Sequence, residues 1–337
     1  MSNKKILMIT PVYFDYYKSI IKGLENCGFH VDWFSDRPTQ KSIFKAVSRV
    51  NPYFVKKRVC SYFNQIISKV SKNNYDYVFF IRGMSYCFNN EMINELKKSQ
   101  KNAKFICYQW DSIKNLKNIK EFWEFFDECY TFDRIDAIEN DNLSFLPLFF
   151  DEDYEVLGKE KFEDDFEYKY DFCYIGTAHP QKYKLIEEMS KELKKKYKKQ
   201  YVYHYMPSKL KYFYHKFKDL EYKNVKMKDF KTKPLSKRHA IDIIFNSKIV
   251  LDAPQTNQNG LTIRAIESLG AKKKLITTNK DIKNYDFYNP INVYIYEGSF
   301  DFESDFFNKP YQPISEEIYR NYSLSYFLKK LFTPFSI

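Results

Sequence analysis

Glycine is scarce in this chain, with only 8 glycines among 337 residues, and the glycine-rich phosphate-binding fingerprints are missing. Neither G-x-G-x-x-G nor G-x-x-x-x-G-K-[ST] occurs in the sequence. These patterns wrap backbone amides around the phosphates of a dinucleotide or of a nucleoside triphosphate. Their absence argues against a Rossmann dehydrogenase and against a P-loop kinase.

Paired cysteines and long apolar runs are missing as well. No two of the six cysteines form a C-x-x-C pair, which argues against a zinc site and favours reduced thiols in a cytosolic protein. No apolar run approaches the roughly 20 residues that span a bilayer. The chain opens on Lys4–Ile9, which reads as a strand and not as a signal peptide. We therefore expect a cytoplasmic protein. Peripheral contact with the inner face of the cell membrane is compatible with this location.

The length of the chain predicts its number of domains, and its net charge indicates the kind of ligand that it attracts. A chain of 337 residues is too long for one small core, so two domains are expected. The net charge of +12 suits phosphates, whether of nucleotides, nucleic acid or an anionic membrane. The composition, rich in Lys and Asn, also fits a low-GC genome, which would account for part of the basicity.

The first 150 residues alternate strands and helices, which predicts a parallel sheet covered by helices. The expected strands are 6–9, 31–34, 77–81, 104–108, 128–131 and 144–147, and the expected helices are 16–26 and 91–98. Residues 151–169 are dense in charge and lack a clear period, so we expect a linker there.

The alternation restarts over 170–312, which predicts a second domain of the same kind. The expected strands are 171–175, 201–205, 248–251, 274–278 and 292–296, and the expected helices are 182–199 and 238–245. Residues 313–337 should form a last helix, over 315–331, that returns to the first domain. The fold class is therefore α/β, with two Rossmann-like domains facing across a cleft, and ligands should bind at the carboxyl ends of the strands.

The most informative stretch is 259–279, which predicts a turn, a helix and a short buried strand. Leu261, Ile263, Ile266 and Leu269 follow helical spacing, and the helix should stop near Gly270. A turn and a helix N-terminus that present backbone amides to one side suit an anionic ligand. A carboxylate further along that helix can accept ribose hydroxyls. We expect a pocket for a nucleoside diphosphate here.

Four segments together resemble the glycosyltransferases of the GT-B fold, in the group 1 branch that includes spore-maturation-like proteins and enzymes of capsule and lipopolysaccharide assembly. They are 170–177, 259–267, 274–279, and Tyr108–Ser112 taken with Thr131–Asp133. The resemblance implies that the second domain holds a nucleotide-sugar, with Glu267 as the second acid of an E-x7-E pattern that binds the ribose. Asn259 occupies the first position of that pattern, so inversion and retention both stay open.

Transfer of a sugar to a hydroxyl requires stabilisation of the leaving diphosphate. We expect the amides near Gly176, Thr177 and Gly260 to serve here with Arg264 and Lys182, and helix ends and cations to replace a metal ion. No cofactor is expected besides the nucleotide-sugar as co-substrate. The predicted donor-binding residues are Gly176, Thr177, Lys182, Asn259, Gly260, Thr262, Arg264, Glu267, Thr278 and Asn279. The structural alternatives are a plain turn at 176–177 and a surface ion pair of Arg264 with Glu267.

An inverting enzyme also needs a base for the acceptor proton. Asp15, in the loop after the first strand, is the first candidate, followed by Asp111 and then His179. A loop aspartate is otherwise a turn or cap residue, and His179 could instead contact a donor phosphate or cap a helix. The candidate acceptor-side residues are Tyr13, Arg82 and Gly83.

Residues 41–72 are basic and contain no Asp or Glu, with apolar residues at roughly helical spacing. Such a segment can lie on an anionic membrane, which would suit a lipid-linked glycan acceptor. The alternative is a helix that packs into the core and presents a solvated basic face.

The motifs and the resemblance together predict a metal-independent glycosyltransferase that moves a sugar from a nucleotide-sugar to a surface polysaccharide such as capsule, O-antigen or exopolysaccharide. One rival is a nucleic-acid-binding protein, because aromatic residues lie among the lysines of 191–231. No known nucleic-acid module appears, and we expect no nucleic-acid partner. The other rival is an epimerase or phosphotransferase with the same two-domain cleft.

Overall fold

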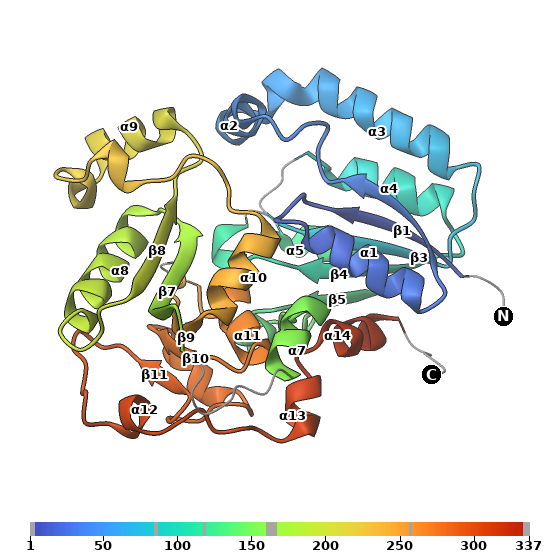
Figure 1. Cartoon of the computed structure of the whole chain (residues 1–337). Helices are drawn as coiled ribbons and strands as arrows, with labels where there is room; N and C mark the ends of the chain where they lie inside the picture. Colours follow the sequence, from blue (N-terminus) through green and yellow to red (C-terminus); the bar gives the residue numbers. More distant parts are fainter. Residues whose placement is uncertain (1–3, 84–86, 117–118, 160–166, 256–257, 333–337) are drawn as a thin grey trace. The chain divides into compact units, whose positions relative to one another are not determined.

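The computed structural model describes residues 4–83, 87–116, 119–159, 167–255 and 258–332. The chain forms two compact units (Figure 1). Unit 1 comprises residues 1–147 and 327–337, and unit 2 comprises residues 148–326. Each unit has its own sheet and is described by itself.

Unit 1 contains a parallel sheet of six strands in the order β2-β1-β3-β4-β5-β6. The strands are β1 (Lys5–Thr10), β2 (His30–Ser35), β3 (Tyr77–Arg82), β4 (Lys104–Gln109), β5 (Glu128–Thr131) and β6 (Ser144–Phe145). The predicted parallel sheet is confirmed, and the parallel arrangement brings the loops after β1, β3, β4 and β5 to one edge.

Helices cover the sheet of unit 1 because its strands are apolar on both faces. The helical segments are α1 (Tyr16–Asn26), α2 (Ser42–Val50), η1 (Pro52–Val55), α3 (Lys56–Val70), α4 (Asn90–Ser99), η2 (Ile113–Asn115), α5 (Ile119–Trp123), α6 (Arg134–Ile138) and α14 (Leu324–Leu331). Phe80 packs with Phe122 of α5, while its neighbour Phe79 packs with Phe332, just after α14. Consecutive strand residues point to opposite faces, so both faces carry a core.

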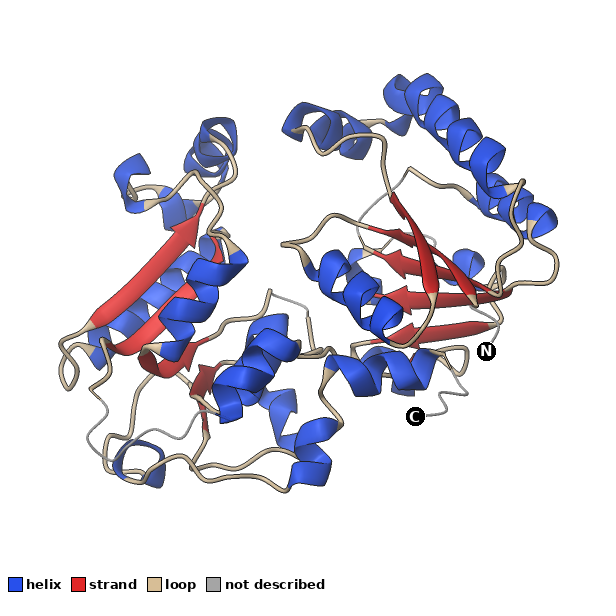
Figure 2. Cartoon of the chain, turned by 45° about the vertical axis from the view of Figure 1, so that its right-hand side comes forward, coloured by secondary structure: helices blue, strands red, loops and turns tan. Residues whose placement is uncertain are grey.

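Unit 2 contains a parallel sheet of five strands in the order β11-β10-β9-β7-β8. The strands are β7 (Tyr170–Thr177), β8 (Gln200–Tyr205), β9 (Ser247–Leu251), β10 (Lys274–Thr277) and β11 (Val293–Ile295). Figure 2 shows the two sheets as separate sets of red strands. The predicted second α/β unit is therefore present.

The helical segments of unit 2 surround its sheet and the loops at its carboxyl edge. They are α7 (Glu152–Lys159), α8 (Pro180–Leu193), α9 (Lys209–Lys218), η3 (Leu220–Tyr222), η4 (Met227–Asp229), α10 (Lys237–Phe245), α11 (Ile263–Gly270), η5 (Lys280–Asn284), α12 (Asp305–Asn308) and α13 (Glu316–Arg320). Ile186, Met189 and Leu193 of α8 pack on Phe172 and Tyr174 of β7. This packing positions the start of α8 beside the end of β7.

The segment expected as a linker, 151–169, contains helix α7. The helix is short, and its buried residues are Tyr154 and Gly158, one turn apart. Gly158 packs so closely on α11 that an added Cβ would lie 2.2 Å from the carbonyl oxygen of Gly270. The sequence of this helix shows little hydrophobic periodicity, because one of its two buried positions is a glycine.

The single helix expected over 315–331 is wrong, because the structure has two helices, α13 and α14. Between them the backbone pairs with Phe150, whose amide donates to Tyr322 O at 2.8 Å and whose carbonyl accepts from Leu324 N at 2.8 Å. The helical ladder cannot continue through residues whose backbone groups are used in this way. From Phe327 onward the chain belongs to unit 1, where the Phe327 ring lies 4.8 Å from that of Tyr108.

Candidate functional site

A pocket of about 210 Å3 lies at the carboxyl edge of the sheet of unit 2. It is lined by His179, Gln181, Lys182, Leu185, Pro254, Gln255 and Thr278. These residues come from the start of α8, from the loop after β9 and from the end of β10. The loops of three neighbouring parallel strands thus meet at one place, as ligand sites of open parallel sheets do.

Asp252 follows β9 directly and is buried beneath this edge. Its carboxylate accepts a hydrogen bond of 2.8 Å from Thr262 Oγ1 and one of 3.3 Å from Thr277 Oγ1. Burial raises the pKa of Asp252, whereas Lys182, the Thr262 hydroxyl and Arg264 oppose that shift. The carboxylate therefore ties the start of α11 to β10 and lies near two cations.

Lys182 lies in the first turn of α8 and lines the pocket. Burial lowers the pKa of Lys182, Asp252 opposes the shift, and Arg264 adds to it. A second anion placed in the pocket would favour the ammonium form, because opposite charges stabilise each other strongly where water is partly excluded. The pocket is thus electrostatically suited to a phosphate.

Arg264 and Glu267 form an ion pair of 2.6 Å along one side of α11. The Glu267 side chain is only 1% exposed and that of Arg264 is 15% exposed, so this is not the surface pair that was the structural alternative. Tyr154 of α7 is buried, and this burial together with the Glu267 charge raises the pKa of its hydroxyl well above the usual value, while Arg264 opposes the shift. The pair is held by packing, and its fixed charges adjoin Asp252 and Lys182.

The turn that precedes α11 is fixed by Asn279. Its side-chain amide donates to Asn259 O at 2.8 Å and to Gly260 O at 3.4 Å, and its oxygen accepts from Asp281 N at 2.9 Å. Thr262 caps α11 by accepting a hydrogen bond from Ala265 N at 3.2 Å. In the structure Asn279 and Thr262 therefore shape the loop, and a contact of either with a nucleotide stays a prediction.

We expected a turn at Gly176 and Thr177. In the structure they are instead the last two residues of β7. They pair with His204 and Tyr205 of β8, while the pairing of β7 with β9 reaches Cys173. Tyr174 lies over the glycine, where an added Cβ would be 2.2 Å from the tyrosine oxygen. The strand extends further than expected because Gly176 makes room for this tyrosine ring.

His179 precedes α8 and lines the pocket from the side of α9. Its ring lies 5.9 Å from that of His215, which in turn contacts Asp219 at 2.6 Å. Burial lowers the pKa of His179, and the nearby His215 and Lys211 add to the effect. A neutral imidazole at the mouth of an anion pocket can accept a proton or donate a hydrogen bond.

The sequence itself matches no protein-family model and no curated protein, whereas its structure is similar to many solved ones. A glycosyltransferase from Rickettsia africae ESF-5 is 15% identical with a TM-score of 0.59, over 98% of this chain and 97% of that one. Anabaena HepE in complex with UDP-glucose is 9% identical with a TM-score of 0.56, over 97% and 98%.

A third solved structure is an alpha-glucosyltransferase in complex with UDP and a 13-mer DNA. It is 12% identical with a TM-score of 0.55, over 86% of this chain and 81% of that one. The chain has two parallel Rossmann-like sheets. The first two solved structures match it over nearly its whole length and theirs, and this match identifies the fold. The chain has the GT-B fold.

In unit 1 of this GT-B chain, Tyr13 and Asp15 lie in the loop after β1. Phe14 and Asp15 both have positive φ angles, of 34° and 66°, which non-glycine residues adopt at a cost. The Asp15 carboxylate is half exposed and pairs with Lys18 at 2.9 Å, and the Tyr13 side chain is 56% exposed. The loop thus presents both predicted residues to solvent.

Arg82 ends β3, Gly83 follows it, and Asp111 lies in the loop after β4, at the same edge of the sheet. The guanidinium of Arg82 is buried and lies 4.3 Å from the Phe122 ring, while Gly83 lies beside Pro11. Asp111 Oδ1 accepts from Ser112 N at 3.1 Å and from Asn115 Nδ2 at 2.8 Å. Their local contacts are structural, and their predicted roles toward an acceptor or a base stay predictions.

Sequence reasoning assigned no role to Asp252, Tyr154 or Asp133, although Thr131–Asp133 is one of the segments that carry the resemblance. Asp133 is buried after β5, where it accepts a 2.6 Å hydrogen bond from Ser112 Oγ and caps α6. An acid directly or nearly directly after a buried strand would have pointed to Asp252 and Asp133. Nothing in the sequence near Tyr154 indicates that it reaches α11, which lies about a hundred residues further along the chain.

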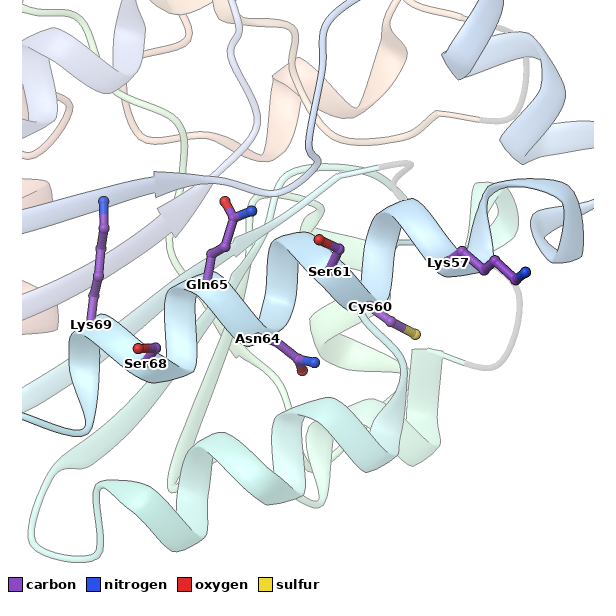
Figure 3. Close-up of a pocket in the computed structure, with 7 residues that line it drawn as sticks. All are labelled: Lys57, Cys60, Ser61, Asn64, Gln65, Ser68 and Lys69. Atoms are coloured by element: carbon purple, nitrogen blue, oxygen red, sulfur yellow. The ribbon is translucent and has the colours of Figure 1, made fainter.

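A second hollow, of about 850 Å3, lies along α3 in unit 1. All seven residues that line it, from Lys57 to Lys69, project from that one helix (Figure 3). No residue of a second element lines it, so the described residues do not converge around a ligand there.

The segment 41–72 divides into two parts with different surfaces. The apolar residues Val59, Phe63, Ile66 and Val70 of α3 are buried, which matches the core-packed alternative for this helix. In α2 and η1, however, Ile43, Val50, Tyr53 and Phe54 are 74–86% exposed. The strongly exposed apolar residues of this stretch therefore lie within 43–54, in α2 and η1.

Within the described ranges, no helix is both long and apolar enough to cross a bilayer. Among the same residues, no three His, Cys, Asp or Glu side chains gather as metal ligands would.

Proposed function

We propose that this GT-B chain is a glycosyltransferase whose unit 2 pocket binds the diphosphate of a nucleotide-sugar. One observation carries the proposal: Lys182 and Arg264 flank the buried Asp252 at the point where the ends of β9 and β10 meet the starts of α8 and α11. Asp252 and Glu267 hold the two cations in place, and Lys182, which lines the pocket, is the cation that a phosphate there would contact. The match to solved glycosyltransferase structures supports the same class.

In this proposal Lys182 and Arg264 contact the two phosphates, and Glu267 binds the ribose. The charges are fixed in position before the reaction, so they stabilise the leaving diphosphate without reorganisation at the moment of transfer. Thr278 lines the same pocket, and the backbone near Gly260, held by Asn279, completes it. Asn259 contributes its backbone to that turn.

For the acceptor we propose a glycan or lipid-linked glycan of a surface polysaccharide, in keeping with the group 1 branch that the motifs resemble. Unit 1 supplies the acceptor side through the loop at Tyr13 and the edge at Arg82 and Gly83. The exposed apolar residues of α2 and η1, in a stretch without any acid, would hold the enzyme at the inner membrane face, where such an acceptor is found.

The base for an inverting reaction is Asp15, with Asp111 and His179 as the alternatives. Asp15 is favoured by its exposure in a strained loop at the carboxyl edge of unit 1. Asp15→Asn should abolish transfer and leave nucleotide affinity unchanged, as measured by turnover and by calorimetry. An active Asp15→Asn enzyme removes Asp15 from this role.

The donor is tested by thermal shift with uridine, guanosine, cytidine and thymidine diphosphates and their sugars. We expect UDP first, because two of the similar structures hold UDP or UDP-glucose. At a concentration of 100 times Kd, a bound nucleotide stabilises by about 2.7 kcal/mol. If none of these compounds raises the melting temperature, the proposed pocket is wrong.

The reaction class is tested with a donor that carries heavy oxygen between the sugar and the β-phosphate. Cleavage at the anomeric carbon leaves the label on the nucleotide and indicates glycosyl transfer. Cleavage at phosphorus leaves it on the sugar and indicates the phosphotransferase. A rearranged sugar without transfer indicates the epimerase.

A further inference from the structure

A stripe of large apolar side chains is exposed along α9 and η3 of unit 2. The exposed fractions are 79% for Leu210, 51% for Phe213, 56% for Tyr214, 88% for Phe217 and 85% for Leu220. The first four follow the spacing i, i+3, i+4 and i+7, so they lie on one face of the helix. In Figure 1 this helix, drawn in yellow, lies beyond the carboxyl end of β8.

The opposite face of α9 is firmly packed, so the exposure of the stripe does not reflect a loose helix. Tyr212 and Tyr222 are buried in a small core with Phe230, and the Tyr222 and Phe230 rings stack at 5.5 Å. Lys216 Nζ donates to Lys223 O at 2.6 Å and to Val225 O at 2.8 Å. The helix therefore holds its apolar stripe outward on a rigid support.

The surroundings of the stripe are strongly basic. Residues 207–233 contain nine lysines and three acids, a net charge of +6. One of the acids, Asp219, is engaged by His215 at 2.6 Å. Lys209 and Lys218 flank the stripe and are exposed, and Lys218 Nζ donates to the Tyr214 hydroxyl at 2.9 Å.

We propose that this surface, Leu210–Leu220, docks on an anionic lipid bilayer. Phe and Leu side chains enter the boundary between headgroups and acyl chains, Tyr214 fits the polar interface, and long lysine side chains reach the anionic headgroups. Charge complementarity selects this occupant over an apolar groove of a neutral protein. The surface belongs to unit 2 alone and is separate in the chain from the exposed residues of α2 and η1.

The direct test places a fluorophore on the stripe of the full-length protein by Phe217→Trp. With vesicles of phosphatidylglycerol and phosphatidylcholine whose acyl chains are brominated, the added tryptophan should shift to the blue and be quenched. Val156→Trp, at a half-exposed position of α7, is the matched control and should be unaffected. The three native tryptophans, all in unit 1, also fluoresce, so the signal of each variant is taken relative to that of the wild type. Binding through α2 and η1 would change the native signal equally in all of these proteins, and a Phe217→Trp variant without additional quenching overturns the proposal.

The second test removes the stripe by Phe217→Ser with Leu220→Ser. Both side chains are more than four-fifths exposed, so the fold should persist, as circular dichroism and melting would show. Partitioning onto the anionic vesicles should fall by more than about tenfold. Val156→Ser should leave it unchanged. Equal partitioning of the double variant and the wild type would contradict the docking role.

Charge and partner class are separated by two further measurements. Lys209→Gln with Lys218→Gln should weaken binding to the anionic vesicles, and vesicles of phosphatidylcholine alone should bind poorly. If the double serine variant instead loses binding to a random oligonucleotide, or a concentration-dependent dimer seen by sedimentation, while vesicle binding is unchanged, the surface serves nucleic acid or a second copy and the proposal fails.

Discussion

At the scale of single residues, the Arg264–Glu267 pair combines a structural and a proposed binding role. Both side chains are largely buried, and both interact electrostatically with the buried Tyr154. Removing one partner leaves the other charge buried, which costs about 3–5 kcal/mol. A single substitution therefore confounds stability with nucleotide binding.

We predict that Glu267→Ala lowers the free energy of unfolding by that amount and weakens UDP binding. The double variant Arg264→Met with Glu267→Leu should recover much of the stability, because no unpaired charge stays buried, but should not recover the affinity. Urea unfolding and calorimetry measure the two quantities. A double variant that binds UDP like the wild type would limit the pair to a structural role.

We predict that Lys182 makes UDP binding depend on pH. Burial lowers the pKa of this lysine, so the free protein loses its ammonium charge at a lower pH than an exposed lysine would. A diphosphate binds the charged form, and its affinity should fall as pH rises through that lowered pKa. In Lys182→Arg the decline should disappear, because arginine stays protonated.

Calorimetry with UDP between neutral and alkaline pH measures this dependence. The pKa of His179 is also lowered, so this histidine titrates at a lower pH than the lysine does. The variant His179→Gln should therefore keep the decline of UDP affinity at alkaline pH. An identical pH profile for Lys182→Arg and wild type would exclude Lys182 as the group responsible.

At the scale of secondary-structure elements, the contact between α7 and α11 fixes the position of the helix that carries Arg264. The two helices approach through Gly158 and Gly270, where any side chain on Gly158 would overlap backbone. Phe150 fills the space beside Gly270, and the Tyr319 hydroxyl donates to its carbonyl at 2.6 Å. Backbone cannot yield as a flexible side chain would.

We predict that Gly158→Ala destabilises unit 2 by about 1–3 kcal/mol, the usual range for overpacking. The shift of α7 should also move Tyr154 away from Arg264 and weaken UDP binding, although residue 158 lies outside the pocket. Gly298→Ala is the contrasting variant, because open space surrounds that glycine and only its φ of 111° is strained. Unchanged UDP affinity in Gly158→Ala would show that α7 does not support the site.

At the scale of the whole molecule, two separate cores share one chain whose end belongs to unit 1. Phe332 is 1% exposed and meets the rings of Tyr77 and Phe79 at 5.3 and 5.2 Å. The last segment therefore completes the core of unit 1, although unit 2 precedes it in sequence.

We predict that Phe332→Ala lowers the stability of unit 1 by about 3 kcal/mol or more. In calorimetric scans of the full chain, this variant should lower one transition, while UDP should raise the other. If UDP raises the same transition that Phe332→Ala lowers, the two units unfold as one and the assignment of the nucleotide to unit 2 needs another measurement.

The sequence alone was sufficient for most of the strands, for the helix after 262 and for the fold class. Short apolar runs such as Ile6–Ile9, and the helical spacing of Leu261, Ile263 and Ile266, are properties of neighbouring residues, and the structure has strands and a helix there. The alternation of such elements restricts the sheet to parallel pairing. The motifs 259–267 and 274–279 lie in α11, in β10 and in the loops beside them, at the carboxyl edge of the sheet of unit 2.

Tertiary structure alone decided which side chains meet. The approach of Tyr154 to Arg264, the position of Lys182 near Asp252 and the break between α13 and α14 all join residues far apart in sequence. No local period reports such contacts, because they depend on which helix packs on which strand. Burial likewise divided two segments of similar composition, hiding the apolar face of α3 and exposing that of α9.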